Sequence, residues 1–232
     1  MISHPEYVAA CPLFVGVPLH TIKQDCPSVE IVSLPHGSVI YTQGQRLEEI
    51  FCVLDGQIKL ARISRDGAEF TTGLLANGEL FGAPLHDPPA FETPETATVR
   101  GAGNLLRVHA NEFRNLLLSH PALGLRVVEL LDRRRQQMER RLECFAFKRT
   151  EARLVETLRE LSGGFEARCE HGFGRHIRLS QQELADLVGA TRPVVSTILN
   201  RLRKEGVLGY TREYVCIREI DAIERILELS PR

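Results

Sequence analysis

The stretch GATRPVVSTILN carries side chains that can recognise the edges of nucleic-acid bases. Arg192 has a planar guanidinium that can donate two parallel hydrogen bonds to guanine, and Asn200 can pair with adenine or bond a phosphate. Ser196 and Thr197 offer hydroxyl groups, while Val194 and the methyl of Thr197 suit the methyl of thymine. These contacts require the five side chains to share one exposed face of a helix that fits a DNA groove.

Two helices must position this face. A capping box at SQQE predicts that the first helix begins at Ser180, because the serine hydroxyl accepts from the N3 amide while the carboxylate of Glu183 accepts from the cap amide. Gly189 predicts its end, since a positive φ costs glycine least. The apolar face of this helix consists of Leu184, Leu187 and Val188.

Thr191 is the expected N-cap of the second helix, which closes near Gly206. Two helices joined by a short turn that contains glycine are typical of a helix-turn-helix, whose second helix enters the major groove. The following stretch, VLGYTREYVCIRE, predicts two short strands around a polar turn, which would form a wing. An ordinary pair of packed helices is the alternative. The apolar face of the second helix consists of Val195, Ile198, Leu199 and Leu202.

The outer face of the second helix supplies the candidates for DNA contact, and solvent exposure is the alternative for each. Residues at its start can read bases, whereas others would position the phosphate backbone. Pro193 lies near the helix start, where its missing amide has no intrahelical partner, and its ring offers only apolar contact. The candidates are Arg192, Ser196, Thr197, Asn200 and Val194 for bases, and Thr191, Ser180, Arg201 and Arg203 for the backbone.

Charge is distributed unevenly along the chain. Residues 133–212 hold 17 Lys and Arg against 10 Asp and Glu, whereas residues 1–132 hold 9 against 15 and residues 213–232 hold 3 against 5. A basic segment in a chain whose formal net charge is −1 is a candidate phosphate-binding face, because the local field attracts a polyanion. A solvated, arginine-rich helix is the alternative.

Length favours about two domains, because domains usually run roughly 100 to 150 residues and the chain has 232. No apolar run approaches the ~18 residues that a membrane span requires. The N-terminal sequence MISHPEYVAACPLFVG lacks the basic and apolar regions of a signal peptide. We therefore expect a cytoplasmic protein without membrane contact.

Outside the helix pair, the residues form no known catalytic or metal-binding pattern. The cysteines include no CxxC pair, which argues against zinc and iron–sulfur sites and favours reduced, packed thiols. A cupin-type metalloenzyme, the alternative class, needs clustered histidines, but these are isolated. We therefore expect no enzyme and no metal. The cysteines are Cys11, Cys26, Cys52, Cys144, Cys169 and Cys216, and the histidines are His36, His86, His109 and His120.

Residues 31–108 contain short β-branched or aromatic runs separated by Gly, Asp and Asn turns, such as EIFCVLDGQIKLARISRDG. This spacing predicts an antiparallel barrel or sandwich. The Asp-Gly pairs in LDGQ and SRDGAE each predict a hairpin turn. A short helix, ANEFRNLLLSHP, follows, with Asn111 as its expected N-cap.

A much longer helical pattern begins at about residue 121. Apolar residues recur every three or four positions, which is typical of a helix that pairs with its own copy, as in a coiled coil. Packing against the chain's own barrel is the alternative. The repeat consists of Val127, Leu131, Met138, Leu142 and Phe145, with an interruption at Arg134 and Arg135.

The order of these parts resembles the CRP/FNR family (cyclic-AMP receptor and fumarate-nitrate-reduction regulators) of bacterial transcription regulators. The resemblance covers roughly residues 12–225 and rests on YTQGQRLEEIFCVLDGQIKL, NGELFG, CFAFKRTEARLVETL and LSQQELADLVGATRPVVSTILNRLRKEGVL. It implies an α+β fold with an antiparallel, jelly-roll-like β-roll over residues 1–120, a dimerisation helix over 121–147 and a winged helix-turn-helix over 148–232. It also implies a homodimer that binds a pseudo-palindrome in double-stranded DNA and contacts RNA polymerase.

The cyclic-nucleotide positions of the family are altered here. Members that bind cyclic AMP place a Glu after the cassette glycine, an Arg-Ser pair at the phosphate and a Thr-Ser pair on the long helix. A glutamate at the phosphate position repels an anion, so we expect that cyclic AMP is not the effector. The corresponding residues, which form our candidate effector pocket, are Gly82, Ala83, Glu95, Thr96 and Met138.

We therefore expect a regulator that binds DNA without a small effector, or one gated by an unidentified molecule or a thiol. Cys144, near the end of the long helix, is the thiol best placed for such gating. A haem sensor is the alternative, because His86 lies in the loop LHDPPAFETP. Pro193 stands where members that read a G·C pair typically carry Glu, so we expect an operator that departs from the family half-site there.

Overall fold

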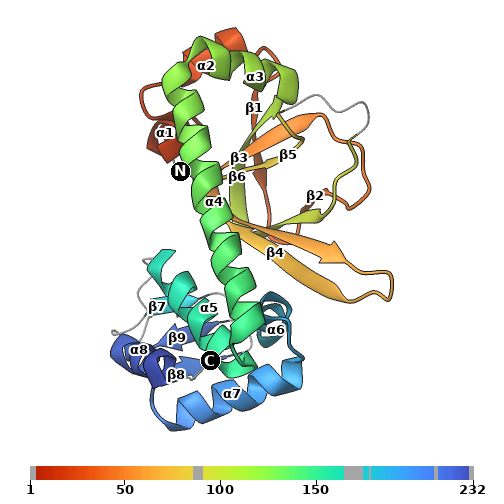
Figure 1. Ribbon diagram of the computed structural model, residues 1–232. Coiled ribbons are helices and arrows are strands. Elements are labelled where there is room, and N and C mark those ends of the chain that lie inside the picture. Colours follow the sequence, from red (N-terminus) through yellow and green to blue (C-terminus); the bar gives the residue numbers. More distant parts are fainter. Residues whose placement is uncertain (1–3, 86–90, 165–174, 178, 212–213, 230–232) are drawn as a thin grey trace. The chain divides into compact units, whose positions relative to one another are not determined.

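The computed structural model describes residues 4–85, 91–164, 175–177, 179–211 and 214–229 (Figure 1). The chain forms two compact units, Met1–Arg135 and Gln136–Arg232. Two residues singled out in the sequence, His86 and Cys169, lie outside the described residues. Within the described ranges, no helix combines the length and hydrophobicity needed to cross a bilayer.

The first unit is built on an antiparallel sheet, which confirms the predicted β-roll. Its strands follow the order β1-β6-β3-β4, with β2 paired to β6 and β5 paired to β3 (Figure 1). The strands are β1 (Glu30–Leu34), β2 (Val39–Tyr41), β3 (Glu49–Ile63), β4 (Glu69–Leu75), β5 (Leu80–Gly82) and β6 (Thr96–His109). The flanking helices are α1 (His4–Ala10), the 3-10 turn η1 (Pro12–Phe14), α2 (Leu19–Asp25) and α3 (Ala110–Ser119).

Strand β3 runs through the first Asp-Gly pair, so the hairpin predicted in LDGQ is wrong. The register against β6 shifts on both sides of Asp55, and Gly56 has a φ of 90°. A Cβ at Gly56 would lie 2.4 Å from the carbonyl oxygen of Ala102, so the strands approach there as only glycine allows. In SRDGAE the hairpin is confirmed, since β3 pairs with β4 and the Ser64 amide donates to the Ala68 carbonyl at 2.9 Å.

Helix α3 begins directly where β6 ends, without a loop. His109, the last residue of β6, is its N-cap, and the ring accepts a hydrogen bond from the Asn111 amide at 3.3 Å. The prediction that Asn111 is the N-cap is therefore wrong by two residues, because the imidazole nitrogen takes the place of the usual oxygen acceptor.

Helix α4 (Pro121–Phe147) has two apolar faces. Leu123, Val127 and Leu130 are buried, and Val127 packs in the core of the first unit. The prediction that Val127 belongs to a seam between two copies is therefore wrong. A second, exposed face lies one residue further on and repeats every three and four residues. It consists of Val128, Leu131, Arg135, Met138, Leu142 and Phe145.

The second unit contains the predicted helix pair and wing. The two wing strands are antiparallel, and a further strand, β7, pairs with β9 to give the sheet order β7-β9-β8. Nothing in the sequence predicted β7. The elements are α5 (Thr150–Gly164), β7 (Arg175–Ile177), α6 (Gln181–Val188), α7 (Arg192–Lys204), β8 (Leu208–Tyr210), β9 (Val215–Ile217) and α8 (Ile220–Leu229).

The cysteines differ in their bonding. Cys216, on β9, is disulfide-bonded, so the expectation of reduced thiols is wrong for this residue. Spacing along the chain does not reveal such a bond, because disulfide formation depends on proximity in the fold. The free cysteines among the described residues are Cys11, Cys26, Cys52 and Cys144.

Candidate nucleic-acid interface

Helix α6 begins with the predicted capping box. The Ser180 hydroxyl accepts from the Glu183 amide at 3.3 Å, and the Glu183 carboxylate accepts from the Ser180 amide at 2.9 Å. The same hydroxyl donates to that carboxylate at 2.8 Å. Gly189 ends the helix in the left-handed region, with a φ of 61°. The role of Ser180 in the structure is thus to fix the start of α6, and its contact with a DNA phosphate stays a prediction.

Helix α7 begins at Arg192, with Thr191 at the N-cap position as predicted. The Thr191 side chain makes no capping hydrogen bond, however. A cap side chain normally serves the amides of the second and third helical residues, and Pro193, the second residue, has none. The Thr197 hydroxyl donates to the Pro193 carbonyl at 3.0 Å, one helical turn back. The turn therefore leaves the Thr191 side chain exposed at the helix start.

The N-terminal half of α7 separates an apolar face from a polar one. Val195 and Leu199 are fully buried, as predicted, while Ile198 is only half-buried. Arg192 and Thr197 are exposed on the other side. The structure thus brings the first base-reading candidates together on one surface. The remaining candidates on this half of the helix are Val194, with 44% of its surface exposed, and Ser196, which is half-buried.

Asn200 is held by neighbours inside the unit. The Tyr210 hydroxyl, on strand β8, donates to Asn200 Oδ1 at 2.7 Å, and the Arg203 guanidinium donates to the same oxygen at 3.1 Å. Arg203 also lies over the Tyr210 ring, 5.1 Å from its centroid. Adenine recognition by asparagine needs this amide oxygen as an acceptor, and two donors already occupy it. The cluster therefore connects α7 to the wing.

The other backbone candidate, Arg201, is engaged in ion pairs. Its guanidinium pairs with Glu151 on α5 and lies 3.6 Å from the carboxylate of Glu205. About half of its side chain is exposed. A solvent-exposed pair of this kind contributes little to stability, so a phosphate could compete for the guanidinium. Arg201 thus stays a candidate for backbone contact, with a charge that its neighbours partly neutralise.

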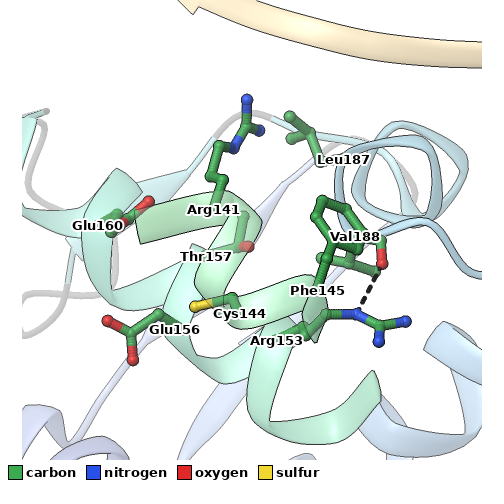
Figure 2. A pocket seen from close by; sticks show the side chains of 9 residues that line it. All are labelled: Arg141, Cys144, Phe145, Arg153, Glu156, Thr157, Glu160, Leu187 and Val188. Atoms are coloured by element: carbon green, nitrogen blue, oxygen red, sulfur yellow. Dashed lines mark hydrogen bonds between the residues drawn. The ribbon is translucent and has the colours of Figure 1, made fainter. Parts of the chain in front are cut away.

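Helix α5 fixes the turn of the helix pair through Arg153, which the sequence reasoning missed. Its Nε donates to the Val188 carbonyl at the end of α6 at 3.0 Å, and its Nη1 donates to the Lys148 carbonyl at 3.2 Å. The guanidinium also lies over the Phe145 ring, 5.2 Å from the centroid (Figure 2). One arginine therefore connects the end of α4, the start of α5 and the end of α6.

Cys144 lies beside this contact and, together with Phe145 and Arg153, lines a small pocket (Figure 2). Burial raises the pKa of its thiol, with a smaller contribution from nearby acidic groups. Burial also lowers the pKa of Arg141 and raises that of Glu160 in the pocket wall. Since the thiolate is the reactive form of cysteine, Cys144 is poorly suited to thiol gating.

The candidate effector residues Gly82 and Ala83 both lie against the backbone carbonyl of Glu49. The Ala83 amide donates to it at 2.8 Å. Gly82 has a φ of 107°, and a Cβ there would lie 2.5 Å from the same oxygen, so no other residue fits. Met138 lies on α4 in the second unit and is 44% exposed. Among the described residues, no three His, Cys, Asp or Glu side chains gather where they could hold a metal ion.

Glu95 and Thr96, at the start of β6, are occupied by neighbouring groups. The Thr72 hydroxyl donates to the Glu95 carboxylate at 2.9 Å, and the Thr96 hydroxyl accepts from the Gln43 amide at 3.0 Å. Burial, followed by the negative charge of Glu95, raises the pKa of Tyr41, which belongs to the apolar core of the roll. Glu95, which corresponds to the phosphate-binding arginine of the family, therefore places a carboxylate at this position.

Comparison with known families and proteins agrees with this architecture. The model of a cyclic nucleotide-binding domain matches residues 31–120, and the model of a Crp-like helix-turn-helix domain matches residues 152–226. The Cyclic AMP receptor protein of Thermus thermophilus is 28% identical over 215 residues, which cover 93% of this chain and 96% of that protein. The Global nitrogen regulator of Synechocystis is 26% identical over 200 residues, which cover 86% and 88%.

Solved structures show the same fold. A transcriptional regulator of the CRP family from Thermus thermophilus aligns with a TM-score of 0.73 at 21% identity, covering 87% of this chain and 98% of that one. The c-di-GMP responsive global regulator of Xanthomonas campestris aligns with a TM-score of 0.72 at 23% identity, covering 86% and 99%. Two domains of known type thus follow each other in the order seen in these proteins.

Proposed function

Because the chain belongs to the CRP/FNR family of DNA-binding transcription regulators, we propose that it is a homodimer whose two α7 helices read the halves of a pseudo-palindromic operator. The observation that carries the proposal is the polar face at the start of α7, where Arg192 and Thr197 are exposed beside Val194. Residues at the N-terminal end of the second helix are those that reach base edges in the major groove.

Arg192 is the principal base reader in this proposal. As the first residue of α7, it places a cation at the positive end of the helix dipole, which costs about 0.3–1 kcal/mol on an exposed surface. Contact with guanine O6 and N7 would offset this cost and supply sequence discrimination. Ser196 and Thr197 would add contacts to bases, whereas Thr191, Ser180, Arg201 and Arg203 would position the phosphate backbone.

The exposed face of α4 supports the proposed homodimer. Val128 is 60% exposed, Leu131 50% and Leu142 68%, at positions that follow the four-three spacing of a heptad seam. Full burial of each such side chain contributes roughly 1.5–3 kcal/mol. Arg135 occupies one seam position and forms an ion pair with Asp132 at 2.8 Å. A charged residue in the seam would lower the stability of the dimer but define the register of the two helices. A second copy of α4 is the occupant that this pattern fits.

We further propose that cyclic AMP is not the signal and that the dimer binds DNA without a small effector. The carboxylate of Glu95, which Thr72 holds in place, would repel a cyclic phosphate. The names of similar proteins refer to cyclic AMP, to nitrogen and to c-di-GMP, so similarity to them singles out no signal. In this proposal the dimer also contacts RNA polymerase, as a regulator of transcription.

Selection from random duplexes by mobility shift, with no effector added, tests DNA recognition. We expect enrichment of a two-fold symmetric site and an affinity that falls steeply with salt, because phosphate contacts release counterions. Added cyclic AMP should leave the affinity for the selected site unchanged. Binding that is indifferent to sequence would overturn the effector-free proposal, and tighter binding with cyclic AMP would overturn the second proposal.

Light scattering on the purified protein tests the dimer. The substitution Leu131→Glu places a charge in the seam and should convert the dimer into monomers, because a buried unpaired charge is costly. Leu118→Glu is the matched control, since Leu118 lies on α3 and is 75% exposed. A wild-type monomer, or a dimer that both variants retain, would show that α4 is not the interface.

A further inference from the structure

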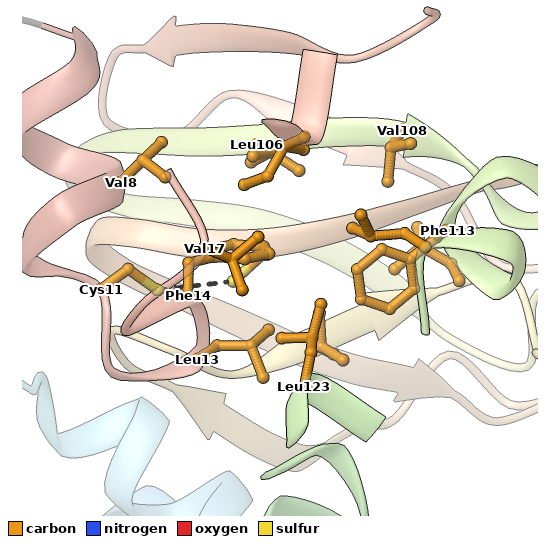
Figure 3. Packing of buried hydrophobic residues seen from close by; sticks show 14 of the residues in the cluster. Val8, Cys11, Leu13, Phe14, Val17, Leu106, Val108, Phe113 and Leu123 are labelled. Atoms are coloured by element: carbon orange, nitrogen blue, oxygen red, sulfur yellow. Dashed lines mark hydrogen bonds between the residues drawn. The ribbon is translucent and has the colours of Figure 1, made fainter. Parts of the chain in front are cut away.

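Three free cysteines belong to one apolar cluster of the first unit. Cys11 immediately precedes η1, Cys26 follows α2, and Cys52 lies in β3; all three are buried. The sulfur atoms of Cys11 and Cys52 are 3.9 Å apart, a contact that Figure 3 marks with a dashed line. The fold thus brings two thiols that are 41 positions apart in the sequence into direct contact.

The geometry requires only a small movement to join the two sulfur atoms. A disulfide bond is about 2.05 Å long, so the atoms must approach each other by roughly 2 Å. Cys52 is fixed in the sheet, where it pairs with Leu106 on β6 and Leu80 on β5. Cys11 lies at the start of a three-residue turn. The N-terminal segment, rather than the sheet, is therefore the part that must move.

The two thiols differ in acidity, and the difference identifies Cys11 as the thiol that attacks peroxide first. The hydrogen bond with Cys52 lowers the pKa of Cys11 to about 7 against the opposing effect of burial, and the backbone amides of Leu13 and Phe14 contribute in the same direction. Burial raises the pKa of Cys52 well above its ordinary value. Burial also raises the pKa of Cys26 to about 11. Since the thiolate is the nucleophile, Cys11 is the reactive member of the cluster.

We propose that Cys11 and Cys52 form an oxidisable dithiol that hydrogen peroxide converts into an intramolecular disulfide. The Cys11 thiolate attacks one peroxide oxygen, the O–O bond breaks, and the leaving hydroxide takes up a proton to become water. The sulfur of Cys52 then attacks the sulfenic acid on Cys11; the S–S bond forms, the S–O bond breaks, and hydroxide leaves with the Cys52 proton as a second water. Two thiols thereby lose two hydrogen atoms, and one peroxide is reduced to two waters.

Access to the pair is controlled by the N-terminal segment. Both thiols are buried, so peroxide reaches Cys11 when this segment opens locally. Arg126 on α4 restrains the segment, because its guanidinium donates to the Leu13 carbonyl at 3.1 Å and to the Val15 carbonyl. Loss of this guanidinium should therefore speed the oxidation several-fold. The site lies in the first unit, whereas the candidates for DNA contact lie in the second, and it adds a redox reaction to the protein.

Peptide mapping of the full-length protein tests the proposal. The protein is reduced, freed of reductant, exposed to hydrogen peroxide, blocked with iodoacetamide and digested with trypsin. Cleavage after lysine and arginine places Cys11, Cys26 and Cys52 on the separate peptides 1–23, 24–46 and 47–59. We expect a species in which peptides 1–23 and 47–59 are joined with the loss of two hydrogen atoms, and dithiothreitol should separate them.

Four variants test the chemistry and the access route. Cys26→Ser should retain the linked species, whereas Cys11→Ser should abolish it. Arg126→Ala should accelerate its formation, and Arg114→Ala, which changes an exposed arginine on α3, should not. The wild-type result decides the matter even where a variant folds poorly. Alkylation of both Cys11 and Cys52 after peroxide treatment, a link of Cys11 to another cysteine, or equal rates for the two arginine variants would overturn the proposal.

Discussion

The hydroxyl of Tyr210 in the wing donates a hydrogen bond of 2.7 Å to Oδ1 of Asn200 on helix α7. Arg203 approaches the same oxygen at 3.1 Å and lies over the same ring. This arrangement gives Asn200 a structural role, since its acceptor oxygen is engaged before any DNA binds. The wing and the recognition helix are thereby joined through side chains as well as through the chain.

Replacement of Tyr210 with phenylalanine should separate positioning from base reading. The variant loses one hydrogen bond, which contributes about 0.5–1.5 kcal/mol, and keeps the ring that Arg203 covers. We expect a small loss of affinity that is equal on the selected operator and on scrambled duplexes, measured by fluorescence anisotropy. Tyr7→Phe, in the first unit, is the control and should change the affinity for neither the operator nor the scrambled duplexes. A changed base preference at one position would instead make Asn200 a base reader.

Two glycines with positive φ provide a matched test of packing at the helix-pair turn. Gly189 and Gly206 have φ values of 61° and 79°. A Cβ at Gly189 would lie 2.8 Å from the Phe145 ring, whereas none of the surrounding atoms lies within 4 Å of a Cβ at Gly206. Alanine at either position should cost about 1–2 kcal/mol of unfolding free energy from backbone strain. Gly189→Ala should cost roughly 1–3 kcal/mol more from overpacking.

Urea unfolding of the two alanine variants measures this difference, and a third substitution checks its cause. In the Phe145→Leu background, the ring that opposes the new methyl is gone, so the excess cost of Gly189→Ala should largely disappear. The cost of Gly206→Ala should stay the same in that background. Equal costs for the two glycines in the wild-type background would show that the turn adapts to the methyl without strain.

The helix pair could be predicted because its signals are local. The capping box at Ser180, the left-handed Gly189 and the buried Val195, Leu199 and Leu202 depend on residues within a few positions of each other. Long-range contacts left no such signal. Tyr210 lies 10 positions from Asn200, and Arg153 lies 35 positions from the carbonyl of Val188 that it bonds.

Other predictions were wrong because one sequence pattern is compatible with two structures. Asp-Gly is favourable in a hairpin turn and in a bulge, and only the close approach of Gly56 to Ala102 distinguishes them. Val127 and Val128 are adjacent and both apolar, so the spacing alone did not show which faces the core. Packing against the first unit buries Val127, whereas Val128 is 60% exposed.

Oxidation of Cys11 should depend on pH in a way that follows its lowered pKa. With a pKa of about 7, the thiolate fraction falls about tenfold for each pH unit below 7 and levels off above it. Burial, followed by the contact with Cys11, raises the pKa of the Cys52 thiol well above its ordinary value, so this thiol stays protonated over this range. We expect the rate of disulfide formation to rise from pH 5 to about 7 and then to level off. A rate that continues to rise towards pH 9.0 would indicate an ordinary thiol.

Arg192→Ala should reduce both affinity and discrimination. Loss of a bidentate contact to guanine costs about 1–3 kcal/mol and relaxes specificity at one base pair of each half-site. Binding to a panel of single-base variants of the selected operator measures both effects. Arg201→Ala is the control, because Arg201 is paired with Glu151 and should change all affinities alike. Equal weakening of every duplex by Arg192→Ala would show that Arg192 contacts only phosphate.

The substitution Pro193→Glu should change which base pair the protein prefers. Glutamate at the second position of α7 is compatible with the helix, because a negative charge is favourable near the N-terminus. Its carboxylate can accept a hydrogen bond from cytosine N4, whereas the proline ring offers only apolar contact. We expect the variant to select a G·C pair at one position of each half-site where the wild-type protein selects differently.

Pro193→Ala separates this effect from the removal of proline. Alanine restores the amide that Thr191 could then bind, but it adds no acceptor for a base. It should therefore leave the selected sequence unchanged. If Pro193→Glu selects the same operator as Pro193→Ala, then position 193 lies outside the groove, and the choice of bases rests on the side chains of Arg192, Ser196 and Thr197 alone.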